Sequence, residues 1–375
     1  MFRAMLRELS YLKCHKVDLF MALIAPLLII LLFANMFAAG KADQLPIVIV
    51  DQDHSEMSRQ VIHALSINHT LSIQSIVQNQ AEADQLINNK DAWGFVSIPE
   101  GAEQRLVRGE DAQIILAYNQ SFFTVGNTIS SAIRSSTVNG LISYMTEHHF
   151  VNNIPHLDQP TPHVKISTLY NPEMSYELYL EPFMVIAVLH VLLCCCVAFA
   201  IGQEFKRNTV QSWLDQQPLA RFFGKILFYV LIFCFWTWCW MFWLVHIRGF
   251  FIAGSLSLIL VAQFFLYFAY AVITSTVLLA SQNLAKTFGF IAIYGGSSPS
   301  FSGITLPLNN APVFTQFWSM IIPYTPYAKL QTEQWVIGSH LSVSLVPFGI
   351  LIIFSVLFAI LSIRLLKKNV LEVAP

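Results

Sequence analysis

Long apolar runs separated by polar segments dominate the pattern of the chain. Uninterrupted runs of about the length that crosses a bilayer lie at residues 19–39, 183–201, 226–245, 256–280 and 345–364. Another apolar run, 284–301, is interrupted by Gly295, Gly296 and Pro299, so we predict a broken helix there. Non-helical backbone at membrane depth needs cover from protein or from a water-filled cavity. Residues 302–344 are therefore expected to form a re-entrant or outer interfacial segment, and the whole pattern predicts an α-helical protein with six transmembrane helices.

The segment from residue 40 to about 178 has a different pattern, because it is polar and has no apolar run of membrane length. Short β-type runs alternate in it with helical patterns, which favours a small α/β domain inserted between the first two transmembrane helices. The predicted strands are 46–50, 71–77, 92–98 and 113–118, and the predicted helices are 55–65, 81–89, 99–108 and a longer one at about 121–150.

A second polar break, Gly202–Lys225, separates the second and third runs. Asn208 or Thr209 can cap a short helix there, which Pro218 must end. Its spacing places Val210, Trp213 and Leu214 on one apolar stripe. Because this segment has no soluble core of its own, we expect the stripe to be covered by a partner.

Residues 1–18 also form an amphipathic pattern. A helix would gather Phe2, Met5, Leu6, Leu9 and Leu12 on one face, with the basic side chains elsewhere. This predicts an interfacial helix on the cytoplasmic leaflet. The alternative is a cytosolic extension of the first transmembrane helix.

Composition places the chain among integral membrane proteins. Of its 375 residues, 55% are hydrophobic and only 11% are charged, and the net charge of −1 gives no indication of nucleic-acid binding. None of the six cysteines lies in the long polar insert, so disulfides are not expected there. We find no clear cleavage site beside the first apolar run and expect it to remain as an anchor.

The distribution of basic residues predicts the orientation. Lys and Arg are concentrated in residues 1–18, in the polar break, at Lys286 and in 364–368, whereas the short outer connections hold only Arg248 and Lys329. By the positive-inside rule, both termini, the break and the tail 365–375 lie in the cytoplasm, and the α/β domain lies outside. The predicted location is the inner (cytoplasmic) membrane, crossed several times.

Several stretches of the chain together resemble the permeases of ABC-2 type exporters. The polar break resembles a family pattern that reads E-[RK]-x-x-GT-x-x-x-L and is followed by a Pro, a basic residue and GK. The matching residues of this chain are Glu204, Thr209, Leu214, Pro218, Arg221 and Gly224-Lys225. The stretches IVDQDHSEMSRQ, IPEGAEQRLVRG, YNPE and SGITLP resemble the family's large-loop members. The chain departs from the family pattern at Asn208, where Gly is usual, at Gln211, where Glu is frequent, and at Glu181-Pro182-Phe183.

The resemblance implies a type V exporter-like fold in which the break is a coupling helix that docks on a separate ABC ATPase subunit. That partner would bind ATP and Mg²⁺, and this chain would need no cofactor. The permease would pair with a second copy or with a paralogue. The sequence leaves open whether a periplasmic adaptor also takes part. The implied ATPase-coupling residues are Glu204, Val210, Trp213, Leu214, Arg221 and Lys225. An amphipathic, drug-like or lipid-like substrate would be moved outward.

Within the membrane, His190 is an ionisable group in mid-helix, where such groups are candidates for function. Together with the interruption at Gly295, Gly296 and Pro299 it is our candidate for the substrate path. A neutral imidazole that is hydrogen-bonded to a neighbouring helix is the structural alternative. The histidines of the polar insert match no metal-ligand spacing.

Two other function classes find less support in the sequence. The chain has no GxxxxGK[ST] phosphate loop, no HExxH motif and no paired carboxylates in its apolar runs, so an enzyme is not indicated. A multi-span receptor whose outer domain binds a ligand is the alternative to an exporter subunit. A partner that hydrolyses ATP would favour export, whereas a kinase or regulator would favour sensing.

Overall fold

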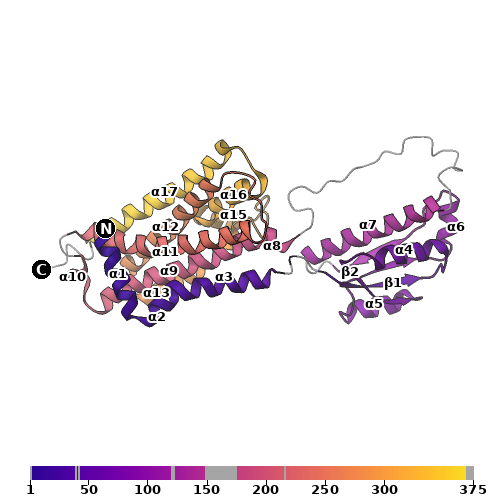
Figure 1. Cartoon of the computed structure of the whole chain (residues 1–375), viewed down its shortest axis with the longest axis horizontal. Helices are drawn as coiled ribbons and strands as arrows, with labels where there is room; N and C mark the ends of the chain where they lie inside the picture. The colour runs from indigo at the N-terminus through magenta and orange to yellow at the C-terminus, as the bar shows by residue number, and fades with distance from the viewer. Residues whose placement is uncertain are drawn as a thin grey trace. The chain divides into compact units, whose positions relative to one another are not determined.

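The computed structural model describes residues 2–38, 40, 43–119, 123–147, 175–214 and 217–368. The chain divides into two compact units, one formed by residues 1–38 together with 176–375, and the other by residues 39–175. Figure 1 shows the helices and strands of both units, coloured along the chain. We call the first the helical unit and the second the α/β unit.

Among the described residues, five helical segments of the helical unit are long and apolar enough to cross a membrane. The first begins with the short helix α2 (Lys16–Leu19), continues through a π-helical turn and ends in α3 (Ala25–Met36). The others are α9 (Glu181–Lys206), α11 (Pro218–His246), α12 (Leu256–Ser281) and α17 (Leu341–Leu366). The chain is therefore a multi-pass membrane protein.

Helices α9 and α12 lie at the centre of the helical unit. Helix α12 packs against α9, α11 and α17, and its Tyr267 and Tyr270 are buried. By contrast, α3 and α17 expose apolar side chains such as Leu32 and Val346. A helix that is apolar all round suits a lipid environment. The outer surfaces of α3 and α17 are therefore suited to contact lipid or other membrane helices.

The interrupted apolar run forms shorter helical pieces. Helix α13 (Leu284–Phe290) runs into a π-helical turn, and after a break at 296–297 α14 (Ser298–Phe301) follows. Beyond it lie α15 (Val313–Ile321) and α16 (Tyr324–Gln331), followed by another π-helical turn (Thr332–Ile337). Helix α15 exposes Val313, Phe314 and Met320, whereas α16 is largely buried. An exposed apolar face of this kind is typical of helices that lie in a membrane interface.

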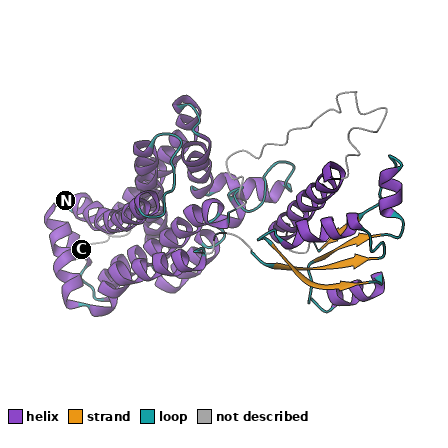
Figure 2. Ribbon diagram, turned by 45° about the vertical axis from the view of Figure 1, so that its right-hand side comes forward, coloured by secondary structure: helices purple, strands orange, loops and turns teal. Residues whose placement is uncertain are grey.

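The α/β unit contains a four-stranded sheet in the order β2-β1-β3-β4 (Figure 2). Strands β1 (Leu45–Asp51), β2 (Leu71–Val77) and β3 (Gly94–Ile98) are parallel, and β4 (Ile115–Tyr118) is antiparallel to β3. The connecting helices are α4 (Glu56–Ser66), α5 (Gln80–Asn88) and α6 (Ala102–Val107), and α7 (Phe123–Glu147) follows the last strand.

Strand β1 is buried on both faces, which explains its unbroken apolar sequence. Ile47 and Ile49 contact the core beneath α4 and α7, while Val48 and Val50 contact the core on the α5 side. Successive strand residues point to opposite faces, so a central parallel strand needs apolar residues at every position. The strands occur where the pattern predicts them, with ends that differ by up to two residues.

Asp51, Asp53 and Ser55 organise the turn after β1. The Asp51 carboxylate accepts hydrogen bonds from the backbone N–H groups of residues 53 and 54, and Ser55 caps α4 by accepting from Ser58 N. Asp53 accepts from the backbone N–H groups of Ala102 and Glu103 at the start of α6. These side chains therefore fix the turn after β1 and the starts of α4 and α6.

Candidate functional site

A buried ion cluster lies where α9, α11 and the N-terminal helix α1 (Phe2–Cys14) meet. Lys225, on α11, places its Nζ 2.7 Å from Oε1 of Glu204 and 3.1 Å from Oε1 of Glu8. The same ammonium donates to the carbonyl oxygen of Ala200 at 3.2 Å. One ammonium group thus joins three helices, of which α1 is far from the other two in the sequence, and all three side chains are buried.

The cluster approaches electrical neutrality because a second cation reaches it from outside. Arg7 Nη2 lies 3.3 Å from Glu204 Oε1, and its side chain is 45% exposed. Two carboxylates are thereby matched by two cations. Burial raises the pKa of Glu8, and the nearby Lys225 opposes that rise. Removing one member of such a buried set would leave an uncompensated charge in a poorly solvated place.

The turn between α9 and the short helix α10 (Val210–Leu214) is held by the same Glu204. Thr209 Oγ1 donates to Glu204 Oε2, and Thr209 N donates to Glu204 O at 3.0 Å. Asn208, between them, has a φ of 55°. That left-handed conformation favours glycine and tolerates asparagine. The difference from the family pattern at this position therefore preserves the turn.

This conformation yields a prediction for position 208. Asn208→Val is expected to lower the free energy of unfolding by about 1–2 kcal/mol, because a β-branched residue is strained at positive φ. Asn208→Gly is expected to change it by less. The measurement is unfolding of the purified chain in mixed micelles, followed by circular dichroism. As a control, Gln211→Val replaces an exposed polar residue inside α10. Equal losses for Asn208→Val and Gln211→Val would contradict the explanation.

Helix α10 is anchored to the helical unit by Trp213. Its ring is 1% exposed, lies 4.7 Å from Lys225 Nζ and packs near the ring of Phe222. Arg221 Nη1 donates to the carbonyl oxygens of Ser212 and Trp213, both at 3.1 Å. These contacts satisfy carbonyl groups that the end of a helix otherwise leaves without partners.

The structure revises the expected role of the apolar stripe on α10. Trp213 and Leu214 are buried in the core of this chain, and Val210 packs against the same core. The stripe is therefore covered by the helical unit itself and offers no free apolar face to another protein. What α10 and its flanks expose is polar and basic, namely Lys206, Arg207, Asn208, Gln211 and Ser212.

Glu8 is a member of the cluster that the sequence pattern did not single out. Helix α1 buries Ala4, Glu8 and Leu12, and this face is turned by about a quarter of the helix circumference from its predicted apolar face. Phe2 is 73% exposed, and Leu6 and Leu9 are exposed as well. The spacing of Ala4, Glu8 and Leu12 could have indicated it, because residues four apart lie on the same face of a helix. Glu8 is the one acidic residue on this buried face.

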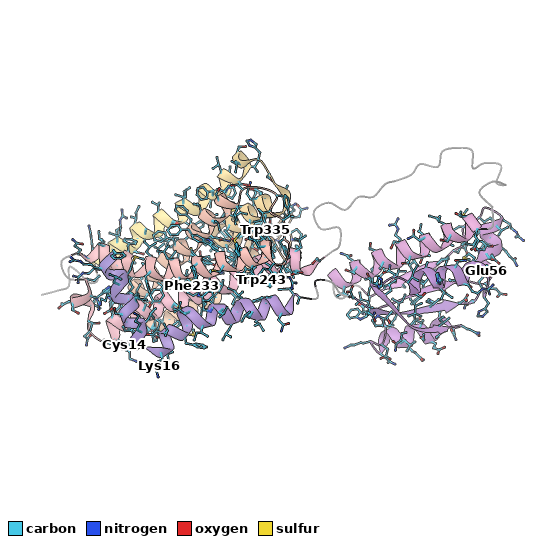
Figure 3. All side chains as sticks on the ribbon, viewed as in Figure 1. Cys14, Lys16, Glu56, Phe233, Trp243 and Trp335 are labelled. Carbon is cyan, nitrogen blue, oxygen red and sulfur yellow. The ribbon has the colours of Figure 1, made fainter. Side chains whose placement is uncertain are left out.

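The exposed apolar face of α1 fits the predicted interfacial helix. Phe2, Leu6 and Leu9 face away from the protein, as does Lys13. Figure 3 labels Cys14 and Lys16, on either side of the turn from α1 into α2, at the end of the helical unit that also carries α10 in Figure 1. We call this the α10 end.

The second set of predicted residues lies elsewhere in the helical unit and is only partly brought together. His190 is fully buried, with Nε2 3.3 Å from the carbonyl oxygen of Gly295 and Nδ1 3.2 Å from that of Ile186. The rings of Tyr270 and Tyr324 pack on it at 4.2 and 5.4 Å.

His190 therefore joins α9 to the end of the π-helical turn before the break, as the structural alternative predicts. Gly295 is buried beside it, whereas Gly296 is exposed and Pro299 is half-buried at the start of α14. In this conformation His190 and Gly295 are packed together by aromatic rings. The substrate-path assignment of the four residues stays a prediction.

A metal centre is not evident in the part of the chain that the structure describes. No group of three His, Cys, Asp or Glu side chains there could hold a metal ion. The chemistry available at the α10 end is electrostatic, with buried charges that couple the positions of α1, α9 and α11. Such an arrangement can transmit displacement between helices, because moving any one of them separates opposite charges in a poorly solvated site.

Comparison with known proteins adds one finding. A family model described as "ABC-2 family transporter protein" matches residues 16–364 and so covers most of the chain, both units included. A search among individually curated proteins returned no match. The matched region contains Glu204, the whole of α10 and Lys225, and it leaves out α1 with Glu8.

Proposed function

Because the chain belongs to the ABC-2 family of transporter proteins, we propose that it is the permease subunit of an ATP-driven exporter, energised by a separate ATPase subunit. Membership makes it a membrane component of a transporter. The ATPase partner, the outward direction and an amphipathic substrate are parts of our proposal. We also propose that the protein lies in the inner membrane, with both termini in the cytoplasm and the α/β unit outside. Residues 284–301 would form a sixth membrane crossing.

The observation that supports this function best is the ion cluster beneath α10. The ATPase subunit would contact the exposed polar side of α10 and its flanks, with Gln211 and Ser212 at the centre. On the opposite side, Trp213 packs over Lys225, which holds Glu204 of α9 and Glu8 of α1. Displacement of α10 during ATP hydrolysis would therefore move the ends of α1, α9 and α11 together.

Pairing of two permease copies, or of one copy with a paralogue, follows from the same proposal. Helices α3 and α17 expose apolar side chains that a second membrane subunit could cover. Motion at the α10 end of one protomer would then tilt its helices against those of the other. Substrate would pass along the contact between the two protomers.

Photo-crosslinking tests the ATPase contact directly. A benzophenone amino acid is placed at Ser212 in the full chain and irradiated in native membranes. We expect a crosslink to a protein that contains a GxxxxGK[ST] phosphate loop and hydrolyses ATP. The matched position is Phe242, an exposed residue near the other end of α11. The proposal fails if Ser212 yields only lipid adducts, or if Phe242 yields the ATPase and Ser212 does not.

Buried residues of α10 are unsuitable for this test. Aspartate at Trp213 or Leu214 would break the packing of α10 and would destabilise the chain whether or not an ATPase binds there. Exposed positions avoid this ambiguity, because their side chains contact little in the chain itself. A substitution that adds bulk at Gln211 and Ser212 should thus separate binding of the ATPase from folding of the permease.

A further inference from the structure

A cavity of about 340 Å³ lies in the helical unit, among the first membrane-spanning segment, α9, α11 and α13. Its walls are largely apolar and aromatic. Three rings, those of Phe199, Tyr229 and Phe288, line it together with sulfur-bearing side chains of Met21, Cys195 and Cys196. Rings and polarizable sulfur atoms adapt to apolar ligands of irregular shape.

One lining residue carries a full charge. Asp18 lies at the start of the first membrane-spanning segment, and among the described residues no lysine or arginine lines the cavity with it. Val17 beside it is 72% exposed, whereas Tyr229 on the opposite wall is buried. The cavity therefore extends from the protein surface near Asp18 inward to α11.

Asp18 differs from the other carboxylates of the α10 end. Glu8 and Glu204 are both paired with Lys225, but the ion pairs found among the described residues do not include Asp18. Arg207 lies nearby, where its guanidinium stacks over the ring of Tyr11 and contacts His15, and it does not line the cavity. Burial, a hydrogen bond to Asp18 and the negative charge of that carboxylate together raise the pKa of Tyr11 to about 12.

Asp18 lies in the first turn of the membrane-spanning segment and is partly buried, so its carboxylate can attract a cation at the entrance of the cavity. An apolar cavity that presents aromatic faces and one negative charge is complementary to a hydrophobic cation. The rings contribute dispersion and cation–π attraction, and the carboxylate contributes charge. A neutral acyl chain would contact the apolar walls but would leave the Asp18 carboxylate without a positively charged partner.

We propose that this cavity binds amphiphilic molecules that carry one positive charge, such as hydrophobic amines and phosphonium ions, with the charge beside Asp18. The inference deepens the proposed function, because it names the substrate class of the exporter and rests on that function for its purpose. Binding itself requires neither the ATPase nor ATP. A failure of the ATPase crosslink and a failure of this binding are therefore separate results.

Equilibrium binding of radiolabelled tetraphenylphosphonium tests the proposal. The full chain is placed in nanodiscs of neutral phosphatidylcholine, and the signal of empty nanodiscs is subtracted. We expect saturable binding that Asp18→Asn weakens about tenfold, because a partly buried cation loses one charge contact. Asp18→Glu keeps the charge and should retain binding. Asp91→Asn, at an exposed site in the α/β unit, is the matched control and should change nothing.

Two further measurements localise the site and separate the alternatives. Cys195→Phe would fill the cavity and should abolish binding while Asp18 is still present. Tetraphenylborate, which has the same shape and the opposite charge, should bind more tightly to Asp18→Asn than to the native chain. If Asp18→Asn binds both ions as the native chain does, the Asp18 carboxylate does not contribute to selectivity for charge. The cavity would then accommodate only lipid chains, and the proposal would be overturned. Unchanged binding by Cys195→Phe would overturn it as well.

Discussion

Replacing Lys225 with methionine is expected to lower the free energy of unfolding by about 3–5 kcal/mol, because it leaves the carboxylates of Glu8 and Glu204 buried without their shared cation. Methionine fills much of the same space, so the loss would come mainly from charge. Unfolding in mixed micelles, followed by circular dichroism, measures it.

The control for that substitution is Lys286→Met, which removes the same charge from an exposed position in α13. It should change the free energy of unfolding by less than about 0.5 kcal/mol. The triple variant Glu8→Gln, Glu204→Gln, Lys225→Met should recover most of the loss, because an uncharged set leaves no buried ion. Equal losses at Lys225 and Lys286 would show that the ion cluster contributes nothing to stability.

Trp213→Ala is expected to lower the free energy of unfolding by about 3–5 kcal/mol, because it opens a cavity where a fully buried ring packs and removes its contact with the Lys225 ammonium. Trp213→Phe should cost less. In the assembled transporter, Trp213→Ala should also reduce the ATPase activity that substrate stimulates, because α10 loses its anchor.

Trp238→Ala provides the matched control, because this ring on α11 is 38% exposed. The same deletion there should cost about 1 kcal/mol or less. Stability and coupling can be separated by measuring ATPase activity at a temperature at which both variants remain folded. Native stability of Trp213→Ala would mean that α10 is not anchored as the structure has it.

Periodicity alone predicted the features of the fold that depend on local sequence. The apolar run at 46–50 predicted a strand, and β1 lies there, although only the structure shows that it is buried on both faces. Five apolar runs predicted the five helices that are long enough to span a membrane. Residues 148–150, the end of a predicted long helix, lie outside the described residues, as do residues 369–375 of the predicted tail.

The candidate site was predicted less completely, because its geometry depends on contacts between distant segments. Glu204 and Lys225 were singled out by resemblance, but nothing local to either residue indicates that they pair. Glu8 is separated from them by about two hundred residues and was missed. The stripe of Val210, Trp213 and Leu214 was recognised as apolar, but periodicity does not say which surface covers it, and the chain covers it itself.

The shortness of α10 has a mechanical consequence. A helix of five residues is little more than one turn and is not stable alone in water. Its shape must therefore be imposed by the surroundings of Trp213 and by the carbonyl contacts of Arg221. A protein that pulls on α10 would unwind it before tension could reach the membrane helices, whereas one that pushes would press it onto its support. Under the proposed function, the subunit would thus transmit compression better than tension, and the ATPase is expected to move toward the bilayer during its power stroke.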